Sequence, residues 1–370
     1  MAALFEPLQL RSVTLPNRIV LSPMCQYSAT DGVPNNWHRI HLGRYATAGL
    51  GLIIAEATHV SARARITPGC LGLYNAVQEA ALAEIAADIK QFGPTPFGIQ
   101  LAHAGRKASS DLPWRGGQSL QGPLAWQAEA PSALPQGEGW HMPQALDEEG
   151  LARVRYEFVE AARRADRAGV DLIELHGAHG YLLHEFVSPI SNRRNDGYGG
   201  TLDNRMRFPL EVFEAVRAVW PAHKPLGIRI TGSDWMPGEG LEIADAVRYA
   251  AALKERGADF VDVSSGGVSL QQKIATGPGY QVHFAEAVKQ ATGLVTMAVG
   301  MITEAEQAEA IVAEGKADLV AMARGLLNDP YWAWHAADRL GGHVHVTPQY
   351  LRGRMRGVDT PREVVLKAAR

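Results

Sequence analysis

Short apolar segments alternate with amphipathic segments along most of the 370-residue chain. Apolar runs bounded by Gly, Pro or charged residues are typical of buried strands, whereas apolar residues three or four positions apart predict helices. The predicted strands are residues 18–24, 50–58, 97–104, 170–175, 225–230, 259–264, 294–299 and 318–323. The predicted helices are residues 36–48, 78–92, 147–168, 202–220, 243–256, 280–291 and 303–313, followed by one more after Asp329.

This order gives about eight strand-then-helix units, which predicts a (β/α)8 TIM barrel, an α/β fold, as a single domain over residues 1–345. Gly169, Gly257 and Gly315 each end a predicted helix just before a strand. Gly is expected there because it tolerates a left-handed backbone. The alternative is a doubly wound open sheet, which should carry a Gly-rich turn after its first strand. Residues 22–25 (SPMC) are not such a turn.

Two segments depart from the alternation. Residues 106–146 follow the third strand, are rich in Pro, Gly, Trp and Ser, and are too long for a simple connection. We expect them to lie over the barrel mouth, where Trp114, Trp126 and Trp140 favour a lid or contact surface over a decorated surface loop. Residues 346–370 form a basic C-terminal segment, for which a subunit contact and a solvated, disordered tail are both open.

Composition narrows the class of protein. The net charge is -3 and the pI about 6.5, so no broad basic surface for nucleic acid is expected. Two cysteines are too few for a disulfide framework or a cysteine-held cluster. No secretory signal or membrane-spanning run is evident, so we expect a cytoplasmic protein with no membrane partner.

Two histidines and a tyrosine, His176, His179 and Tyr181, follow the fourth predicted strand. In a barrel, active sites lie at the carboxyl ends of the strands. Two imidazoles three residues apart can bind a metal, with Glu174 or Glu185 as a third ligand, or can donate two hydrogen bonds to one oxygen atom. No HExxH-type spacing supports the metal, and two satisfied core histidines are a third interpretation. Tyr181 is a candidate proton donor.

Other ionisable residues lie at strand ends. Cys25 and Tyr27 follow the first strand, where the cysteine is a nucleophile, a cofactor contact or an apolar filler; Cys70 is expected to be structural. Gln100 and His103 lie toward the end of the third strand. Arg229 lies within the fifth and needs an acceptor, either a carboxylate such as Asp262 or an electron-rich ligand.

The seventh and eighth strands end near Gly300 and at Ala323-Arg324. In TIM barrels the loops after these two strands, together with a helix N-terminus, frequently bind phosphate. This position predicts a phosphorylated ligand at the barrel mouth.

Residues 17–27, 100–107, 176–200 and 323–325 together resemble the old yellow enzymes, FMN-dependent ene-reductases, and the likeness extends over residues 4–330. Cys25 with Tyr27, and the HGAH form of the histidine motif, resemble the bacterial branch that includes the xenobiotic reductases and YqjM-like enzymes. The yeast-type branch has asparagine in place of the second histidine.

The resemblance implies bound FMN, NADPH or NADH as the reductant, and α,β-unsaturated carbonyl or nitro compounds as substrates. It implies that His176 and His179 bind the activating oxygen of the substrate, that Tyr27 lines the pocket and that Tyr181 supplies the proton. It also implies that Arg352 reaches the site of a neighbouring subunit, in a homodimer or larger homo-oligomer. The implied FMN contacts are Ser22, Pro23, Met24, Cys25, Ala57, Gln100, Arg229, Gly300, Ala323 and Arg324.

Two other functions remain open. A metal-dependent barrel hydrolase would use the two histidines and a carboxylate, and would be colourless. A non-catalytic flavin-binding sensor would be yellow but would not turn over any enone.

Overall fold

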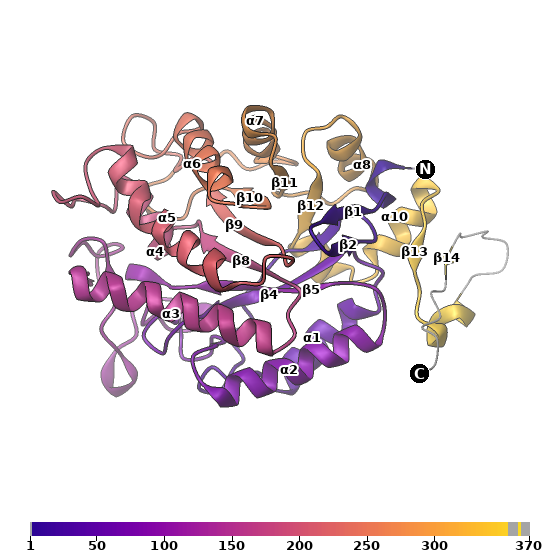
Figure 1. The fold of residues 1–370 in the computed structure, drawn as a ribbon, viewed down its shortest axis with the longest axis horizontal. Coiled ribbons are helices and arrows are strands. Elements are labelled where there is room, and N and C mark those ends of the chain that lie inside the picture. The colour runs from indigo at the N-terminus through magenta and orange to yellow at the C-terminus, as the bar shows by residue number, and fades with distance from the viewer. Residues whose placement is uncertain (1, 354–361, 364–370) are drawn as a thin grey trace.

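The structure is a computed structural model that describes residues 2–353 and 362–363 (Figure 1). Within them, eight parallel strands form a closed barrel in the order β10-β11-β12-β3-β4-β5-β8-β9. Pairing of β12 with β3 closes the barrel, which confirms the predicted (β/α)8 fold. The strands are β3 (Ile19–Leu21), β4 (Leu52–His59), β5 (Phe97–Ala102), β8 (Leu172–Gly177), β9 (Leu226–Thr231), β10 (Phe260–Ser264), β11 (Val295–Ala298) and β12 (Leu319–Met322).

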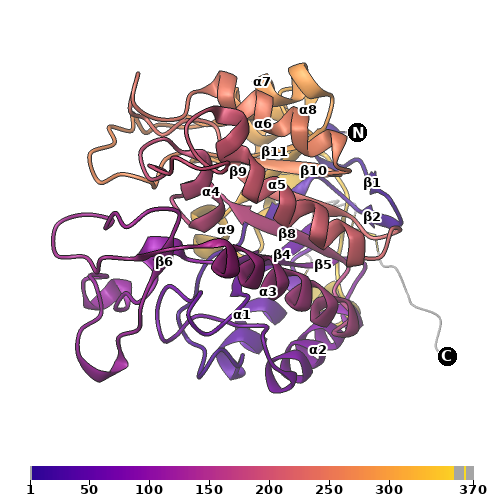
Figure 2. The same cartoon turned by 60° about the vertical axis from the view of Figure 1, so that its left-hand side comes forward.

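Helices surround the strands and bury one face against them (Figure 2). The predicted helices are confirmed as α1 (Asn36–Ala46), α2 (Ala76–Gln91), α3 (Glu148–Arg167), α5 (Leu202–Val219), α6 (Ile243–Glu255), α7 (Val282–Thr292), α8 (Ala305–Ala313) and α10 (Trp332–Leu340). Two short helices, α4 (Leu182–Val187) and α9 (Arg324–Asn328), were not predicted. Each has fewer than two full turns, so its apolar residues cannot show a helical period.

Local signals fix where these elements begin and end. Asp147 caps α3 by accepting a hydrogen bond from the Gly150 amide at 2.8 Å. Gly169, Gly257 and Gly315 have φ of 78°, 84° and 74°, so the predicted left-handed glycines before the strands are confirmed.

Side chains inside the barrel change character along its axis. Toward the amino ends of the strands they are apolar and form one cluster, which includes Leu52, Leu172, Phe260 and Leu319. One step toward the carboxyl ends, the inward side chains become polar, with Gln100 beside Glu174 and Arg229 beside Asp262. The barrel is therefore a packed core at one end and a polar, ionisable site at the other.

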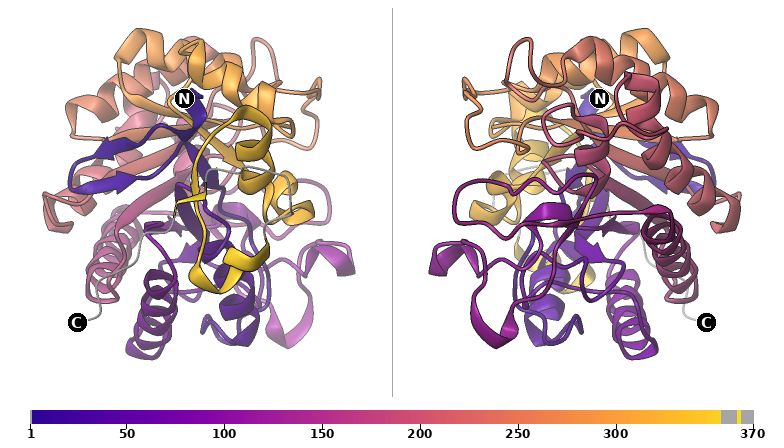
Figure 3. Two further views of the ribbon diagram at one scale, coloured as in Figure 1. Left: turned by 90° about the vertical axis from the view of Figure 1, so that its right-hand side faces the viewer. Right: turned by 90° about the vertical axis from the view of Figure 1, so that its left-hand side faces the viewer.

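A hairpin of β1 (Leu8–Leu10) and β2 (Val13–Leu15) lies at the amino end of the barrel (Figure 3, left). Its Leu10 and Leu15 join the apolar cluster inside the barrel. Arg11 pairs with Asp259 at 2.5 Å, just before β10. The sequence pattern did not predict this hairpin, because each of its strands is short and has a single buried residue, so neither forms an apolar run.

The excursion of residues 106–146 projects on the side of the molecule opposite the β1–β2 hairpin (Figure 2). It contains β6 (Glu129–Ala130) and β7 (Gln144–Ala145), which pair in parallel. Its buried Glu129 accepts from Arg153 of α3 at 2.6 Å, and its Trp114 ring meets Tyr27 edge-on at 5.9 Å. In the part of the chain that the structure describes, no helix is long and apolar enough to cross a membrane.

Candidate active site at the carboxyl ends of the strands

The histidine pair lies at the end of β8. His176 is buried, and its ring meets that of His179 nearly perpendicularly, with centroids 5.2 Å apart. His176 Nδ1 accepts from the Ala178 amide at 3.3 Å. His179 Nε2 lies 2.7 Å from the Ser264 hydroxyl, at the end of β10. The end of β8 thus carries both imidazoles, and Ser264 at the end of β10 contacts the second.

The loop that carries the pair is tightly held. His179 has φ of 59° and Tyr27 has φ of 50°, left-handed values that non-glycine residues seldom adopt outside functional sites. A Cβ on Gly267 would lie 2.5 Å from the His179 carbonyl oxygen, so only glycine fits there. His184 Nδ1 accepts from the Gly180 amide at 2.7 Å, and its Nε2 lies 3.0 Å from buried Asp234.

Both imidazoles are neutral at neutral pH. Burial lowers the pKa of His176 and of His179 well below the ordinary value, and the positive charge of Arg229 lowers the pKa of both further. A neutral imidazole presents one N–H donor and one acceptor. The pair is therefore suited to donating hydrogen bonds to an oxygen atom.

Tyr181 completes a cluster with this pair. Its ring lies 4.7 Å from the His176 ring, and the Lys107 ammonium lies 5.2 Å above the Tyr181 ring. Lys107 also donates to the His179 carbonyl at 2.6 Å. Burial raises the pKa of Tyr181 well above its ordinary value, so its phenol keeps the proton that a general acid must supply.

Cys25 and Tyr27 lie in the loop after β3 and face the same region. Together with Tyr181 they pack on a small apolar cluster that contains Cys70, Ala104 and other residues. Burial raises the pKa of the Cys25 thiol well above its ordinary value. A protonated thiol is a poor nucleophile, so the geometry favours the contact and filler interpretations of Cys25.

An ionisable layer lies one step below the histidines. Gln100 donates to Glu174 Oε1 at 2.7 Å. Arg229 Nε lies 3.1 Å from Asp262 Oδ2, and Arg229 Nη1 donates to Ser22 Oγ at 3.2 Å. Of the two partners left open for Arg229, the structure shows the carboxylate of Asp262.

A cavity of about 320 Å³ opens beside this layer. Arg229 and Ser22 form its inner wall, and the loops after β11 and β12 form its rim. Gly300 has φ of 113°, and a Cβ there would lie 2.9 Å from Gln281 Nε2. The structure thus brings together five of the predicted cofactor contacts in one cavity: Ser22, Arg229, Gly300, Ala323 and Arg324.

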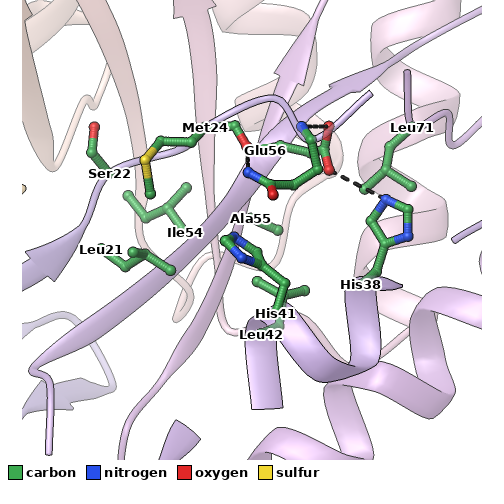
Figure 4. A pocket seen from close by; sticks show the side chains of 11 residues that line it. Leu21, Ser22, Met24, His38, His41, Leu42, Ile54, Ala55, Glu56 and Leu71 are labelled. Atoms are coloured by element: carbon green, nitrogen blue, oxygen red, sulfur yellow. Dashed lines mark hydrogen bonds and ion pairs between the residues drawn. The ribbon is translucent and has the colours of Figure 1, made fainter. Parts of the chain in front are cut away.

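Behind the loop after β3 lies a second, much smaller space of about 10 Å³ (Figure 4). The Glu56 carboxylate lies between His38 Nε2 at 3.3 Å and the Gln26 amide at 2.9 Å. Such a volume admits about one water molecule. These contacts fix the backbone next to Cys25 and Tyr27 rather than bind a substrate.

A wider groove of about 700 Å³ is lined by Trp235, Met236 and Phe284 among others. None of the predicted site residues lines it. Its link to the site is indirect, because Trp235 Nε1 donates to Ser265 Oγ, which donates to Gln281 Oε1. Convergent ionisable groups, rather than cavity size, identify the mouth of the barrel as the site.

Three sequence candidates lie elsewhere or serve the scaffold. Arg352 is exposed in a short helical segment, Pro348–Gly353, that packs through Tyr350 on Tyr331 and Trp334. His103 accepts from the Gly105 amide at 3.1 Å and lies 3.7 Å from Glu129. Cys70 is buried and accepts from the Thr67 amide, as expected of a structural cysteine.

Sequence reasoning missed Lys107, Ser264 and Gln281 as site residues. Lys107 ends the segment 100–107 that resembles the family, but neither a helical nor a strand pattern links it to Gln100. Ser264 is the last residue of β10, and this position at a strand end was the only feature of the sequence that could have indicated a site residue. Among the described residues, no three His, Cys, Asp or Glu side chains are grouped as a metal site.

A comparison with known proteins finds a matching family and similar relatives. Residues 3–341 match the NADH:flavin oxidoreductase / NADH oxidase family. The chain is 47% identical over 352 residues to an NADPH dehydrogenase of Geobacillus sp. (strain WCH70), covering 95% of this chain and 98% of the relative. It is 42% identical over 352 residues to an NADPH dehydrogenase of Bacillus subtilis (strain 168), with the same coverage.

Among solved structures, morphinone reductase in complex with tetrahydroNAD superposes with a TM-score of 0.74. The two chains are 28% identical, and the match covers 97% of each. The likeness therefore spans the whole barrel.

Proposed function

The chain belongs to the NADH:flavin oxidoreductase / NADH oxidase family, and from that membership we propose that it is an FMN-dependent NAD(P)H:enone reductase. The observation that carries the proposal is the pair of neutral imidazoles 5.2 Å apart beside Tyr181. This arrangement suits an α,β-unsaturated carbonyl, or a nitro compound, whose oxygen gains negative charge during reduction. Family membership gives the metal-dependent hydrolase no support.

The donor set fits FMN. Arg324 and Gly300 line the cavity, so a phosphate bound there would meet a cation. Arg229 and Ser22 line the inner wall and offer N–H and O–H groups to the ring. We propose Gln100 on β5, Ala57 on β4, and Pro23, Met24 and Cys25 in the loop after β3 as further contacts of the ring. When bound there, FMN supplies hydride transfer between the nicotinamide and the substrate carbon.

The reductant is proposed from the relatives. Two of them are named NADPH dehydrogenase, and a solved structure of morphinone reductase contains tetrahydroNAD. NADPH is therefore the first reductant to test, with NADH beside it.

The protonation of His176 follows from its neighbour. The Ala178 amide can only donate, so His176 Nδ1 is an acceptor and Nε2 carries the proton. This leaves Nε2–H free to donate to the substrate oxygen. For His179 to donate as well, its Nδ1 must carry the proton and the Ser264 hydroxyl must donate to Nε2. The Ser264 hydroxyl also lies 3.2 Å from Gln281 Oε1 and cannot donate to both acceptors, so Gln281 Oε1 would then accept only from the Ser265 hydroxyl, at 2.5 Å.

These donors act on the transition state more than on the ground state. As hydride reaches the carbon β to the carbonyl, charge develops on the oxygen and both hydrogen bonds strengthen. Tyr181 then supplies the proton to the α carbon. Tyr27 and Trp114, which meet edge-on, limit the access of water to the pocket.

Tyr181→Phe is expected to slow transfer from reduced enzyme to 2-cyclohexenone about 10²–10⁴-fold, the range for a general acid. Reduction of the enzyme by NADPH should be unchanged, because no proton from Tyr181 is needed there. Stopped-flow absorbance separates the two half-reactions. Tyr156→Phe, on the exposed face of α3, is the control, and equal rates in the two variants would exclude Tyr181 as the donor.

We further propose a homo-oligomer in which Arg352 of one subunit enters the site of another. Arg352→Ala should raise KM for the enone about tenfold, the loss expected for one charge-assisted hydrogen bond. Arg248→Ala removes another exposed arginine, which pairs with Asp203, and should leave KM unchanged. An Arg352 variant with unaltered KM would contradict the reach into the neighbour.

The reaction class is tested by its product. FMN-loaded protein with NADPH and 2-cyclohexenone under anaerobic conditions should give cyclohexanone. Formation of the allylic alcohol would mean that the carbonyl rather than the C=C bond is reduced. Absence of turnover with a fully reducible flavin would favour the sensor interpretation.

A further inference from the structure

The ionisable layer contains two buried carboxyl groups and one cation. Glu174 and Asp262 are each completely buried. Arg229 pairs with Asp262 at 3.1 Å, whereas Glu174 Oε1 accepts a hydrogen bond from the neutral side-chain amide of Gln100 at 2.7 Å. The other oxygen, Glu174 Oε2, is buried without a hydrogen-bond partner. A buried carboxylate without a cation is unstable unless it takes up a proton.

Strand register explains why Glu174 has no cation of its own. Glu174 lies opposite Gln100 on β5 and opposite Gly227 on β9. The place of a side chain at position 227 is filled by the Phe260 ring, 2.4 Å from where a Cβ would be. Arg229 is in register with His176 and Asp262 instead.

We propose that Glu174 is a positioning residue that carries its proton at neutral pH and thereby keeps the layer under the cofactor free of excess negative charge. This inference rests on the proposed function, because it concerns the residues that would contact FMN. Gln100 and Arg229 are the groups through which Glu174 acts.

The charges that face Glu174 support this assignment. Burial and, after it, the negative charge of the neighbouring Asp262 raise the pKa of Glu174 to about 8, although Arg229 and the Gln100 hydrogen bond oppose the shift. His176, two residues along β8, is neutral because burial lowers its pKa. With Glu174 protonated, Arg229 and Asp262 sum to zero charge.

The consequence is a second proton linked to reduction. Hydride transfer from NADPH would bring two electrons and one proton to bound FMN and would leave one negative charge near Arg229. Below the pKa of Glu174 its carboxyl group is already protonated, so reduction adds no further proton to the protein. Above it, the new negative charge disfavours the Glu174 carboxylate, which takes one proton from solvent.

The test counts protons taken from solvent during anaerobic reduction of the FMN-loaded protein by NADPH, using a pH indicator, because the transferred hydride itself takes no proton from solvent. Wild-type protein and Glu174→Gln should take up the same number of protons at about pH 6.5, and wild type should take up one more per two electrons at about pH 9. Glu185→Gln is the matched control. Glu185 is also completely buried, with a pKa that burial raises to about 8, but it lies on α4 outside the layer. It should behave as wild type.

A second readout needs no cofactor. Glu174 is ionised in the unfolded chain above its ordinary pKa but protonated in the folded one, so the folded state binds more protons and stability falls as pH rises toward about 8. The Tm advantage of Glu174→Gln over wild type should therefore grow from about pH 5 to pH 8.

Each outcome decides something. Equal proton uptake in wild type and Glu174→Gln at alkaline pH would overturn the role of Glu174 and leave the flavoenzyme intact. A protein that binds no FMN would overturn the proposed function instead. If Glu174→Gln does not fold, Asp262→Asn frees Arg229 for Glu174 and should lower the pH at which the extra proton is taken up. An unchanged onset would also overturn the role.

Discussion

His179→Ala is expected to lower kcat/KM for 2-cyclohexenone about 10²–10³-fold, the loss that follows removal of one preorganised donor to a developing oxyanion. The imidazole lies at the end of β8, with its Nε2 2.7 Å from the Ser264 hydroxyl. Lys107 holds the backbone of His179 by donating to its carbonyl oxygen. Alanine removes the N–H donor without disturbing either strand. Steady-state kinetics with NADPH in excess measure the effect.

The matched control is His179→Asn, which keeps an N–H donor near the same place. It should retain most of the activity that alanine loses. If both variants lose activity equally, the effect comes from the strained backbone at φ 59° rather than from the hydrogen bond. If neither loses activity, the oxygen of the substrate does not bind there.

Arg229→Met is expected to lower the free energy of unfolding by about 3–5 kcal/mol, the range for removing one partner of a buried ion pair. The substitution leaves Asp262 completely buried without its cation, at a site where Arg229 is only 7% exposed. It also removes the positive charge at the inner wall of the cavity. Urea unfolding and the flavin content of the purified protein measure the two effects.

The pH dependence of this loss has a definite sign. Asp262 without Arg229 must take up a proton, so the destabilisation should grow as pH rises. Arg229→Lys keeps the charge but cannot reach both Asp262 and Ser22 with a planar fork, so an intermediate loss is expected. An Arg229→Met protein as stable and as flavin-rich as wild type would contradict the assignment.

The sequence predicted the barrel because a buried parallel strand is apolar on both faces and its helix is amphipathic, and both patterns are local. The helices α4 and α9 were missed because five or six residues cannot show a helical period. The β1–β2 hairpin was missed because each of its strands buries only one residue, unlike the equally short but wholly buried β3. The capping glycines were predictable because left-handed backbone favours glycine whatever the tertiary context.

The site was predictable where residues lie at strand ends, as His176, Tyr181 and Arg229 do. Partnerships between strands were mostly not predictable, because they depend on strand register; Asp262 could be considered for Arg229 only because a buried arginine needs an acceptor. Nothing in the sequence pairs Gln100 with Glu174, or Ser264 with His179. From the sequence Glu174 is a candidate metal ligand only, whereas in the fold its carboxyl group accepts a hydrogen bond from the Gln100 side-chain amide.

The measurement that tests the account most directly is the visible spectrum of the FMN-loaded protein, followed by anaerobic NADPH and then 2-cyclohexenone. We expect a flavin spectrum that bleaches with NADPH and returns when the enone is added. A protein that cannot be loaded with FMN, or a reduced flavin that the enone leaves bleached, would contradict it.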